Sequence, residues 1–314
     1  MSAAGARASA SAFAPASVGN VAIGFDILGF AVGALGDTVT VTRRPEPGVE
    51  IASIRGVAQD ISREARDNTA GQALLAMLAA ARADFGCRVA IEKGIPLGSG
   101  LGGSAASAVA AVVAGNALLQ MRYSQLELLK FAMAGEAVAS GGQHVDNIAP
   151  SLFGGLVLTV GIDHPRVKQI PVPADIRAVI VHPHMYLATA KARAILKTTV
   201  ELSDFVWQTA NLAGFISGCY TDDLDMIRAS LEDVVIEPQR QALIPGFHDV
   251  RRGAMQAGAL GCSISGAGPS MFAWATAALA PAVLAAMQRE FARQDLRTDA
   301  WCIEVSPAGA RVLP

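Results

Sequence analysis

Residues 96–107 read Pro-Leu-Gly-Ser-Gly-Leu-Gly-Gly-Ser-Ala-Ala-Ser, and this glycine- and serine-rich stretch decides the fold. The run Arg-Val-Ala-Ile-Glu-Lys at 88–93 predicts a strand that enters it, and the alanine-rich segment 104–120 predicts a helix that leaves it. Glycines permit positive φ and close backbone approach, consecutive N–H groups bind anions, and a helix N-terminus adds the positive end of its dipole. This order of strand, loop and helix predicts a phosphate-binding site.

The loop fits neither of two familiar nucleotide-binding fingerprints. A Walker A loop requires Gly-Lys followed by Ser or Thr, and the dinucleotide fingerprint GxGxxG requires an acidic residue on the next strand; the sequence provides neither. A glycine-rich turn between closely packed elements is the purely structural alternative. The length of the stretch and its serines, Ser99, Ser104 and Ser107, favour the phosphate site.

The composition describes a folded chain with a large interior. Of 314 residues, 52% are hydrophobic and 17% are charged, which excludes disorder, and the length favours two domains. A net charge of −2, without a run of Lys and Arg, offers no binding surface to nucleic acid. An apolar, charge-poor chain of this kind also favours a homodimer.

Neither a membrane span nor an oxidising compartment is indicated. No stretch of about 18 apolar residues is uninterrupted, because the best candidate, 105–121, contains Ser107, Asn116 and Gln120. Residues 1–17 lack the continuous apolar core of a signal peptide. The four cysteines are scattered, without a CxxC pair or a His at metal-ligand spacing. We therefore expect reduced thiols in a cytoplasmic protein that binds no membrane.

The remaining pattern predicts an α+β protein of two domains. The first half contains an alternating strand at 39–42, a second strand at 49–54 after a Pro-Gly turn, and a helix over 68–84. His-Pro at 164–165 and Pro-Val-Pro at 171–173 form the most linker-like segment, so the domains are expected at 1–165 and 166–314. The second half alternates strands, at 178–181, 262–264, 271–275 and 301–305, with helices from 189 and over 203–232, 246–257 and 280–293.

One carboxylate stands in an otherwise apolar helix. Ser124 and Glu127 form a capping box that predicts a helix start, and the last turns of that helix, 131–138, are apolar apart from Glu136. Burying a carboxylate is costly unless it pairs with a cation, and Mg²⁺ prefers carboxylate and hydroxyl oxygens together with phosphates. Glu136 is therefore a candidate magnesium ligand. An ion pair with Lys130 or an arginine, or a surface position, is the alternative.

Three ordered motifs resemble those of the GHMP kinases, a family that includes galactokinase and mevalonate kinase. They are the sequences at 15–26 (Pro-Ala-Ser-Val-Gly-Asn-Val-Ala-Ile-Gly-Phe-Asp), at 96–107 as quoted above, and at 264–270 (Ile-Ser-Gly-Ala-Gly-Pro-Ser). The resemblance extends over almost the whole chain. It implies an N-terminal ribosomal-protein-S5-like β/α domain that holds ATP and a C-terminal ferredoxin-like α/β sandwich.

Three further segments resemble those of the family members that phosphorylate homoserine. They are 143–150 (Gln-His-Val-Asp-Asn-Ile-Ala-Pro), 189–196 (Thr-Ala-Lys-Ala-Arg-Ala-Ile-Leu), and Arg240 followed by Leu-Ile-Pro-Gly-Phe at 243–247. This resemblance implies Mg²⁺-dependent transfer of the ATP γ-phosphoryl group to the hydroxyl of L-homoserine, a step of threonine biosynthesis.

The same resemblance implies roles for individual residues. The nucleotide would be held by Asn68, Lys93, Pro96, Gly98, Ser99, Gly100, Leu101, Gly102, Gly103, Ser104 and Ser107. The magnesium site would be completed by Ser104 and Glu136. The substrate would be surrounded by Asp26, His144, Arg193, Arg240 and Gly266, and its hydroxyl would be oriented by Asn20, Asn147 and Thr189. Asp146, next to Asn147, is expected to play a supporting role.

Side-chain chemistry agrees with an amino acid as the substrate. Guanidinium groups match the geometry of a carboxylate, so Arg193 and Arg240 suit the acid group, and Asp26 suits the ammonium group. Galactose is neutral, and mevalonate has no amine. Taken singly, each of these charged residues also suits a surface salt bridge, His144 suits an ordinary loop or core position, and Gly266 suits a hairpin turn.

Two other functions stay open on the sequence alone. A different GHMP kinase would phosphorylate shikimate, mevalonate or a sugar, and a nucleotide-binding regulator would have kept the fold and lost catalysis. The charged set of two arginines and Asp26 argues against the first, and Ser104 with Glu136 argues against the second. Lys93 is the least specific nucleotide residue, because a lysine at a strand end is usually solvated.

Overall fold

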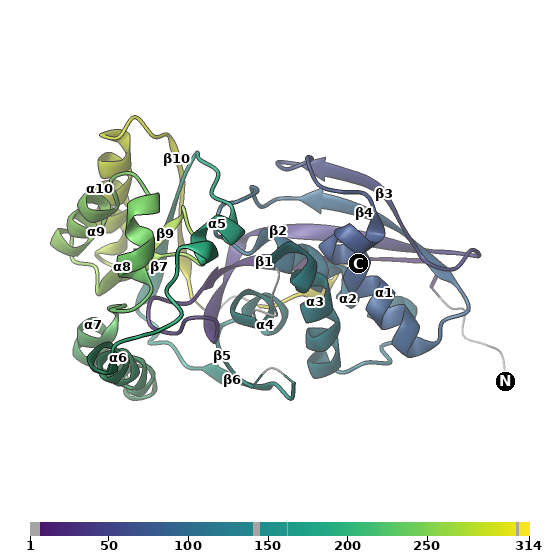
Figure 1. Cartoon of the computed structure of the whole chain (residues 1–314), viewed down its shortest axis with the longest axis horizontal. Helices are drawn as coiled ribbons and strands as arrows, with labels where there is room; N and C mark the ends of the chain where they lie inside the picture. Colours follow the sequence, from purple (N-terminus) through teal and green to yellow (C-terminus); the bar gives the residue numbers. More distant parts are fainter. Residues whose placement is uncertain (1–6, 141–144, 162, 306–307) are drawn as a thin grey trace.

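Two lobes, each built on its own β-sheet, make up the elongated chain (Figure 1). The structure is a computed structural model that describes residues 7–140, 145–161, 163–305 and 308–314. The first lobe is built on a seven-stranded sheet and the second on a four-stranded sheet. No helix within these described ranges is long and apolar enough to cross a membrane.

The seven-stranded sheet is organised around β2 (Leu28–Arg44). The first residues of β2 pair with β5 (Leu156–Val160), and its later residues pair with β4 (Gly86–Lys93), both in antiparallel register. β1 (Ser9–Gly19) pairs with β2 along its whole length, and β3 (Val49–Gly56) lies parallel to β4. Both strands expected in the first half are confirmed, and the first of them extends well beyond its predicted bounds.

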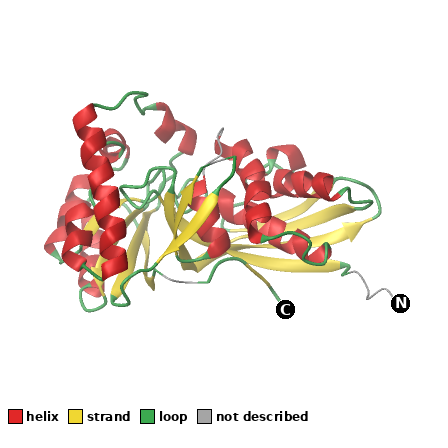
Figure 2. Cartoon of the chain, turned by 90° about the horizontal axis from the view of Figure 1, so that it is seen from below, coloured by secondary structure: helices red, strands yellow, loops and turns green. Residues whose placement is uncertain are grey.

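Helices cover one face of this sheet (Figure 2). They are α1 (Thr69–Ala81), which follows a short 3-10 turn at Ala65–Asp67, α2 (Gly103–Leu118), α3 (Gln125–Ser140) and α4 (Val145–Phe153). In α2 every residue from 105 to 118 is buried, because its small side chains let it pack closely against β1, β2 and α1. The strand and helix predicted on either side of the glycine-rich loop are confirmed as β4 and α2.

Residues 140–150 are rich in glycine and polar side chains, a local pattern that predicts no helix, yet part of helix α4 lies within them. It contains Pro150, whose ring nitrogen has no hydrogen to donate within the helix. Gly29 of β2 lies directly against the carbonyl oxygen of Asp146, where a Cβ atom would have no room. Burial of Val145 and Ile148 in the core stabilises the helix in spite of its proline.

The four-stranded sheet of the second lobe is antiparallel. Its order is β10 (Thr298–Glu304), β7 (Ile176–Pro183), β9 (Met271–Thr276) and β8 (Gly261–Ile264). One face is covered by α9 (Phe247–Gln256) and α10 (Ala280–Ala292). On the other face, Phe215 of α6 (Leu202–Thr221) meets Trp274, with ring centroids 5.0 Å apart. The predicted α/β sandwich is confirmed.

Shorter helices complete the second lobe. They are α5 (Thr189–Ala194), α7 (Leu224–Ser230), α8 (Glu237–Arg240) and a 3-10 turn at Gln241–Leu243.

The two lobes share one apolar core. Phe30 of β2 contacts Phe272 and Trp274 of β9, with ring centroids 5.7 and 6.0 Å apart. The larger cluster of buried side chains runs from the first sheet to this face of the second, and a separate cluster lies beneath α9 and α10. Continuous packing of this kind fixes the residues of one lobe relative to those of the other.

Sheet membership does not follow the boundary expected at residue 165. β6 (Arg166–Ile170) pairs with β5, and β11 (Arg311–Val312) pairs with β1, so both belong to the first sheet. Both strands lie within the range expected for the second domain. Prolines mark a change of chain direction, but they contain no information about which sheet the next strand joins.

Candidate active site

A cavity of about 220 Å³ lies where the two lobes meet. Most of the residues predicted to act at the site line this one space. They are Asn20, Asp26, Pro96, Gly98, Ser99, Gly100, Gly102, Gly103, Ser104, Glu136, Asn147, Thr189, Arg193, Arg240 and Gly266.

The glycine-rich loop connects β4 to α2 along the cavity. Gly98, Gly100 and Gly102 have φ of 60°, 78° and 67°, the left-handed region that favours glycine. At Gly102 a Cβ atom would also collide with the side chains of Ser17 and Asn147. Helix α2 begins at the next residue, and the first N–H groups of a helix have no acceptor within it. This end of α2 therefore offers an anion both donors and the positive end of a dipole.

The turn between β8 and β9 holds the loop from the other lobe. Ser265 Oγ donates a hydrogen bond to the Gly100 carbonyl at 2.7 Å, and the Ser270 N–H donates to the Ser99 carbonyl at 3.1 Å. Gly266 lies in this turn and also lines the cavity, so its place in the hairpin is compatible with the predicted contact with the substrate.

Ser104 and Glu136 bring a hydroxyl and a carboxylate together at the start of α2. Ser104 Oγ donates to Glu136 Oε1 at 3.0 Å, and Glu136 is only 9% exposed. Mg²⁺ takes oxygen ligands and usually binds through one or two carboxylates together with phosphates and waters. The described part of the chain contains no group of three or more His, Cys, Asp or Glu side chains that could hold a metal by itself. Ser104 and Glu136 therefore suit a Mg²⁺ ion whose other ligands are nucleotide phosphates and waters.

Asp26, Arg193 and Arg240 gather around the ring of Phe25. Arg193 Nη2 donates to Asp26 Oδ1 at 2.7 Å, and the Cζ atoms of Arg193 and Arg240 lie 5.1 and 5.2 Å from the ring centroid. Asp26 and Arg193 were expected to bind opposite ends of the substrate, and here they bind each other. A zwitterion can open such a pair, because it offers one group of each charge.

Arg240 presents a buried guanidinium to the same region. The residue is 3% exposed, its Nε donates to the Ala192 carbonyl at 3.0 Å, and its Nη1 donates to the Gly266 carbonyl at 3.2 Å. Burial lowers the pKa of Arg240, and the neighbouring Arg193 lowers it further. A carboxylate placed beside these two guanidiniums would relieve their mutual repulsion.

The first motif forms a left-handed turn that ends at the cavity. Asn20, Val21 and Ala22 have φ of 70°, 46° and 60°, which residues other than glycine seldom adopt. Asn20 Nδ2 donates to the Gly266 carbonyl at 2.9 Å, and its Oδ1 accepts the N–H of Asp26 at 3.1 Å. Asn20, expected to orient the reacting hydroxyl, thus fixes the position of Asp26 relative to the turn of the other lobe.

Asn147 enters the cavity from α4 with its amide held on both sides. Its Oδ1 accepts a hydrogen bond from Ser17 Oγ at 2.9 Å, and its Nδ2 donates to Asp146 Oδ2 at 3.1 Å. Asp146 also lines the cavity, so its carboxylate is closer to a ligand than the expected supporting role implies. Thr189, the first residue of α5, faces the same space.

Some residues predicted to hold the nucleotide do not line the cavity. Asn68 instead caps α1, where its Oδ1 accepts the N–H groups of Ala70 and Gly71. Lys93 is 3% exposed, in contrast to the solvated lysine usual at a strand end, and it forms an ion pair with Asp37. The predicted nucleotide residues outside the cavity lining are Asn68, Lys93, Leu101 and Ser107. His144 lies outside the described residues.

Residues without a predicted role also take part in the site or its support, among them Phe25, Ser17 and Asp37. Phe25 and Ser17 lie within the first motif, so their position beside recognised residues was the available signal. Asp37, by contrast, stands in a strand with no local pattern that marks it as a partner of Lys93.

Behind Arg240, the buried carboxylate of Glu237 predicts a pH-dependent stability. Burial raises the pKa of Glu237 to about 7, above its ordinary value near 4.5. The folded chain therefore binds this proton more tightly than the unfolded chain, so the free energy of unfolding should fall as pH rises from about 4.5 to 7. We expect Glu237→Gln to remove this loss, which amounts to roughly 3 kcal/mol at most.

Melting temperatures of the wild type and Glu237→Gln at pH 5 and pH 8 measure the effect. The variant should gain a few degrees relative to the wild type at the higher pH, where the wild-type carboxylate is ionised. The same difference in melting temperature at both pH values would contradict this assignment. Ser263, whose hydroxyl donates to Glu237, stays in place in both proteins.

Two family models match separate parts of the chain, one in each half. The model of the GHMP kinases N terminal domain matches residues 68–155, and the model of the GHMP kinases C terminal domain matches residues 215–293. The chain is 49% identical over 309 residues to a homoserine kinase of Xylella fastidiosa (strain 9a5c), with 97% of this chain and 94% of that protein covered. It is 41% identical over 314 residues to a homoserine kinase of Chlorobium phaeobacteroides (strain BS1), with 96% and 98% covered.

Solved structures agree with these matches. A homoserine kinase from Cytophaga hutchinsonii is 42% identical to this chain and superposes with a TM-score of 0.95 over 100% of both chains. A mevalonate kinase from L. major is 16% identical with a TM-score of 0.70 over 95% of this chain and 96% of that one, and it shares the fold alone. The two family models and the full-length relatives together show that this chain belongs to the GHMP kinase family.

Proposed function

We propose that this chain transfers the γ-phosphoryl group of ATP to the side-chain hydroxyl of L-homoserine, giving O-phospho-L-homoserine and ADP. The observation that carries the proposal is that one cavity joins the glycine-rich loop to Asp26, Arg193 and Arg240. The relatives named homoserine kinase, at 49% and 41% identity over nearly the full length, support the choice of acceptor. The product would serve threonine biosynthesis.

The glycine-rich loop and α2 would hold the triphosphate. The N–H groups at the start of α2 and the backbone of Gly100 and Gly102 are suited to the phosphates, because they line the cavity and include donors that the helix leaves unused. Ser104 and Glu136 would hold Mg²⁺, which when bound neutralises charge on the phosphates.

The charged groups opposite the loop would read the amino acid. The carboxylate of the substrate would bind Arg240 and Arg193. Arg193 would then leave Asp26, and the ammonium group of the substrate would take its place there. Asn147 and Thr189 would orient the hydroxyl towards the nucleotide. Phosphoryl transfer depends chiefly on positioning and charge neutralisation, so the site needs no strong base.

A panel of acceptors tests the substrate. ADP release should be at least about a hundredfold faster, as kcat/KM, with L-homoserine than with shikimate, mevalonate or galactose. Shikimate and mevalonate offer a carboxylate but no ammonium group for Asp26, and galactose offers neither charge. Phosphorus NMR of the product should identify a phosphate monoester of homoserine. Turnover of shikimate or mevalonate without turnover of homoserine would favour a different GHMP kinase. Binding of ATP without turnover of any acceptor would favour a nucleotide-binding regulator.

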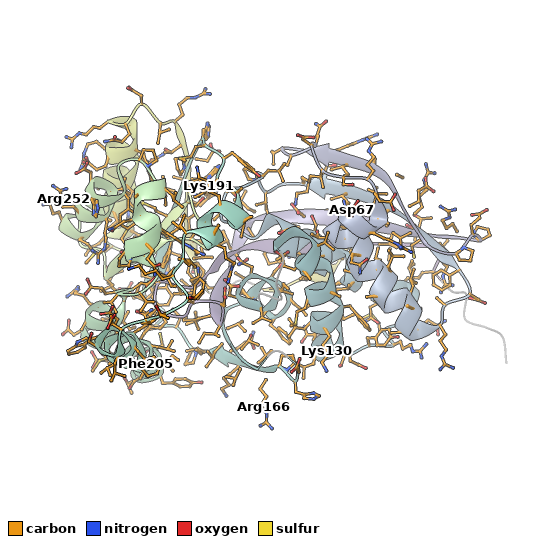
Figure 3. All side chains as sticks on the ribbon, viewed as in Figure 1. Asp67, Lys130, Arg166, Lys191, Phe205 and Arg252 are labelled. Carbon is orange, nitrogen blue, oxygen red and sulfur yellow. The ribbon has the colours of Figure 1, made fainter. Side chains whose placement is uncertain are left out.

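We further propose a cytoplasmic homodimer. Helix α6 exposes large apolar side chains, of which Phe205 is labelled in Figure 3, and such a surface is suited to a second subunit. The side chains that support this are Leu202, Phe205, Val206 and Trp207, which are 54% to 76% exposed. The free thiols of Cys87, Cys219, Cys262 and Cys302 support a reducing compartment.

A further inference from the structure

A buried charged cluster lies beneath the glycine-rich loop. It consists of Asp37, Lys93 and Ser107, which are 0%, 3% and 4% exposed. Removing a carboxylate and an ammonium group from water is costly, and a buried ion pair seldom stabilises a fold more than apolar residues of the same size would. The presence of such a pair at this place therefore indicates that its task is to position the surrounding backbone.

The hydrogen bonds of the cluster join three elements. Lys93 Nζ donates to Asp37, to the Gly103 carbonyl at 2.7 Å and to Ser107 Oγ at 2.9 Å, so all three of its donors have acceptors. Asp37 Oδ2 accepts a further hydrogen bond from Ser107 Oγ at 2.6 Å, and its Oδ1 accepts the N–H of Gly94 at 3.0 Å. The cluster thus ties β2 and the end of β4 to the first turn of α2.

The two residues at the ends of the loop are bound to this same cluster. The loop leaves β4 at Gly94, which donates to Asp37, and it enters α2 at Gly103, whose carbonyl accepts from Lys93. A shift of either end would re-aim the N–H groups of α2 and the hydroxyl of Ser104, which together face the cavity. Displacements of about 1 Å at a phosphoryl-transfer site are enough to lower rates markedly.

The cluster lies behind the loop and is not part of the cavity wall. Asp37, Lys93 and Ser107 do not line the cavity. The charge of Lys93 is balanced by the adjacent Asp37, so the pair adds little net charge at the phosphates. These two facts separate the cluster from a lysine that contacts phosphate directly.

We propose that Asp37, Lys93 and Ser107 are positioning residues that hold both ends of the glycine-rich loop in the geometry that binds the nucleotide. This inference rests on the proposed function only in so far as the loop binds a nucleotide. It does not depend on the identity of the acceptor.

Ser107→Ala tests the proposal with the least disturbance of the fold. The change removes one hydrogen bond from Lys93 and one from Asp37 while the ion pair stays in place. We expect the Kd of ADP–Mg²⁺, measured by titration calorimetry, and the KM of ATP to rise about tenfold, as for other residues that support a ligand-binding shell. The KM of homoserine should change less than about twofold, because its residues belong to the opposite wall.

Asn116→Ala is the matched control. Asn116 is 1% exposed in the same helix, but it lies at the far end of α2, where its side chain bonds to the backbone of Tyr123. Its replacement should lower the melting temperature without a change in nucleotide affinity. Equal losses of nucleotide affinity in Asn116→Ala and Ser107→Ala would overturn the proposal, because general loosening of α2 would then explain both.

The double variant Asp37→Asn/Lys93→Gln provides a second arm. It leaves no unpaired buried charge, so it avoids the main cause of misfolding after a single change. The glutamine side chain is one bond shorter than lysine, so it cannot reach all three acceptors. We expect nucleotide affinity to fall at least as far as in Ser107→Ala. Affinities within about twofold of the wild type in both variants would overturn the proposal.

The measurement of ADP–Mg²⁺ binding also tests this proposal independently of the proposal that homoserine is the acceptor. Wild-type protein that binds ADP–Mg²⁺ but does not phosphorylate homoserine would contradict the acceptor, and the cluster could still be tested by calorimetry. Wild-type protein that fails to bind ADP–Mg²⁺ would overturn both.

Discussion

Glu136→Gln is expected to lower kcat for homoserine phosphorylation by about a thousandfold, the scale observed when a group that stabilises transition-state charge is removed. Glu136 is 9% exposed, and its Oε1 lies 3.0 Å from Ser104 Oγ at the start of the helix that faces the nucleotide. A glutamine preserves the shape and the hydrogen bond from Ser104, but it removes the negative charge that attracts Mg²⁺. The rate should be measured at saturating ATP and homoserine over a range of Mg²⁺ concentrations.

ADP titrations distinguish a metal ligand from a structural residue. In the wild type, the affinity for ADP should increase with Mg²⁺ concentration, and in Glu136→Gln this increase should be much smaller. Without Mg²⁺, the two proteins should bind ADP with the same affinity. Glu127→Gln is the control, because Glu127 lies on the same helix, where it bonds Ser124 as a helix cap. A Glu136→Gln protein with the rate and Mg²⁺ dependence of the wild type would show that this carboxylate is not the metal ligand.

Arg240→Met is expected to raise the KM of homoserine about a hundredfold, equivalent to about 2.7 kcal/mol, with little change in the KM of ATP. The guanidinium of Arg240 is buried, and its hydrogen bonds within the described part of the chain go to the carbonyl oxygens of Ala192 and Gly266. Its charge is therefore more available to a ligand than that of Arg193, which is ion-paired with Asp26. Methionine has a similar stem, and it removes the charge together with the hydrogen bonds to these two carbonyl oxygens.

L-homoserinamide lacks the carboxylate charge of homoserine. Measured with the wild type and Arg240→Met, it completes a thermodynamic cycle in which one change is made to the protein and the other to the substrate. The wild type should use the amide as poorly as Arg240→Met uses homoserine, and the variant should scarcely distinguish the two compounds. Arg252→Met is the control, since Arg252 lies at the surface of the second lobe (Figure 3) and pairs with Asp249. An equal rise in the KM of ATP and of homoserine in Arg240→Met would point to a folding defect instead of lost recognition.

The sequence predicts local structure correctly where the hydrogen bonds that form it join residues close together in the chain. The capping box is one example, because Glu127 Oε2 accepts the N–H of Ser124 at 2.8 Å and begins α3 as predicted. The glycine-rich loop is another, since its glycines take the positive φ that such a turn requires. Helix α4 is the counterexample. Its proline argues locally against a helix, and burial against the first sheet outweighs that preference.

The sequence by itself determined the loop, its flanking strand and helix, and the residue types for a phosphate, a cation and an amino acid. Only the tertiary structure decided which of these meet. Asp26 and Arg193 are 167 residues apart, and Asn20 and Gly266 are 246 apart, yet each pair is joined by a hydrogen bond. Such contacts depend on the packing of one lobe against the other, which local patterns do not encode. The same holds for Lys93, because only burial beside Asp37 distinguishes a support beneath the loop from a solvated lysine at a strand end.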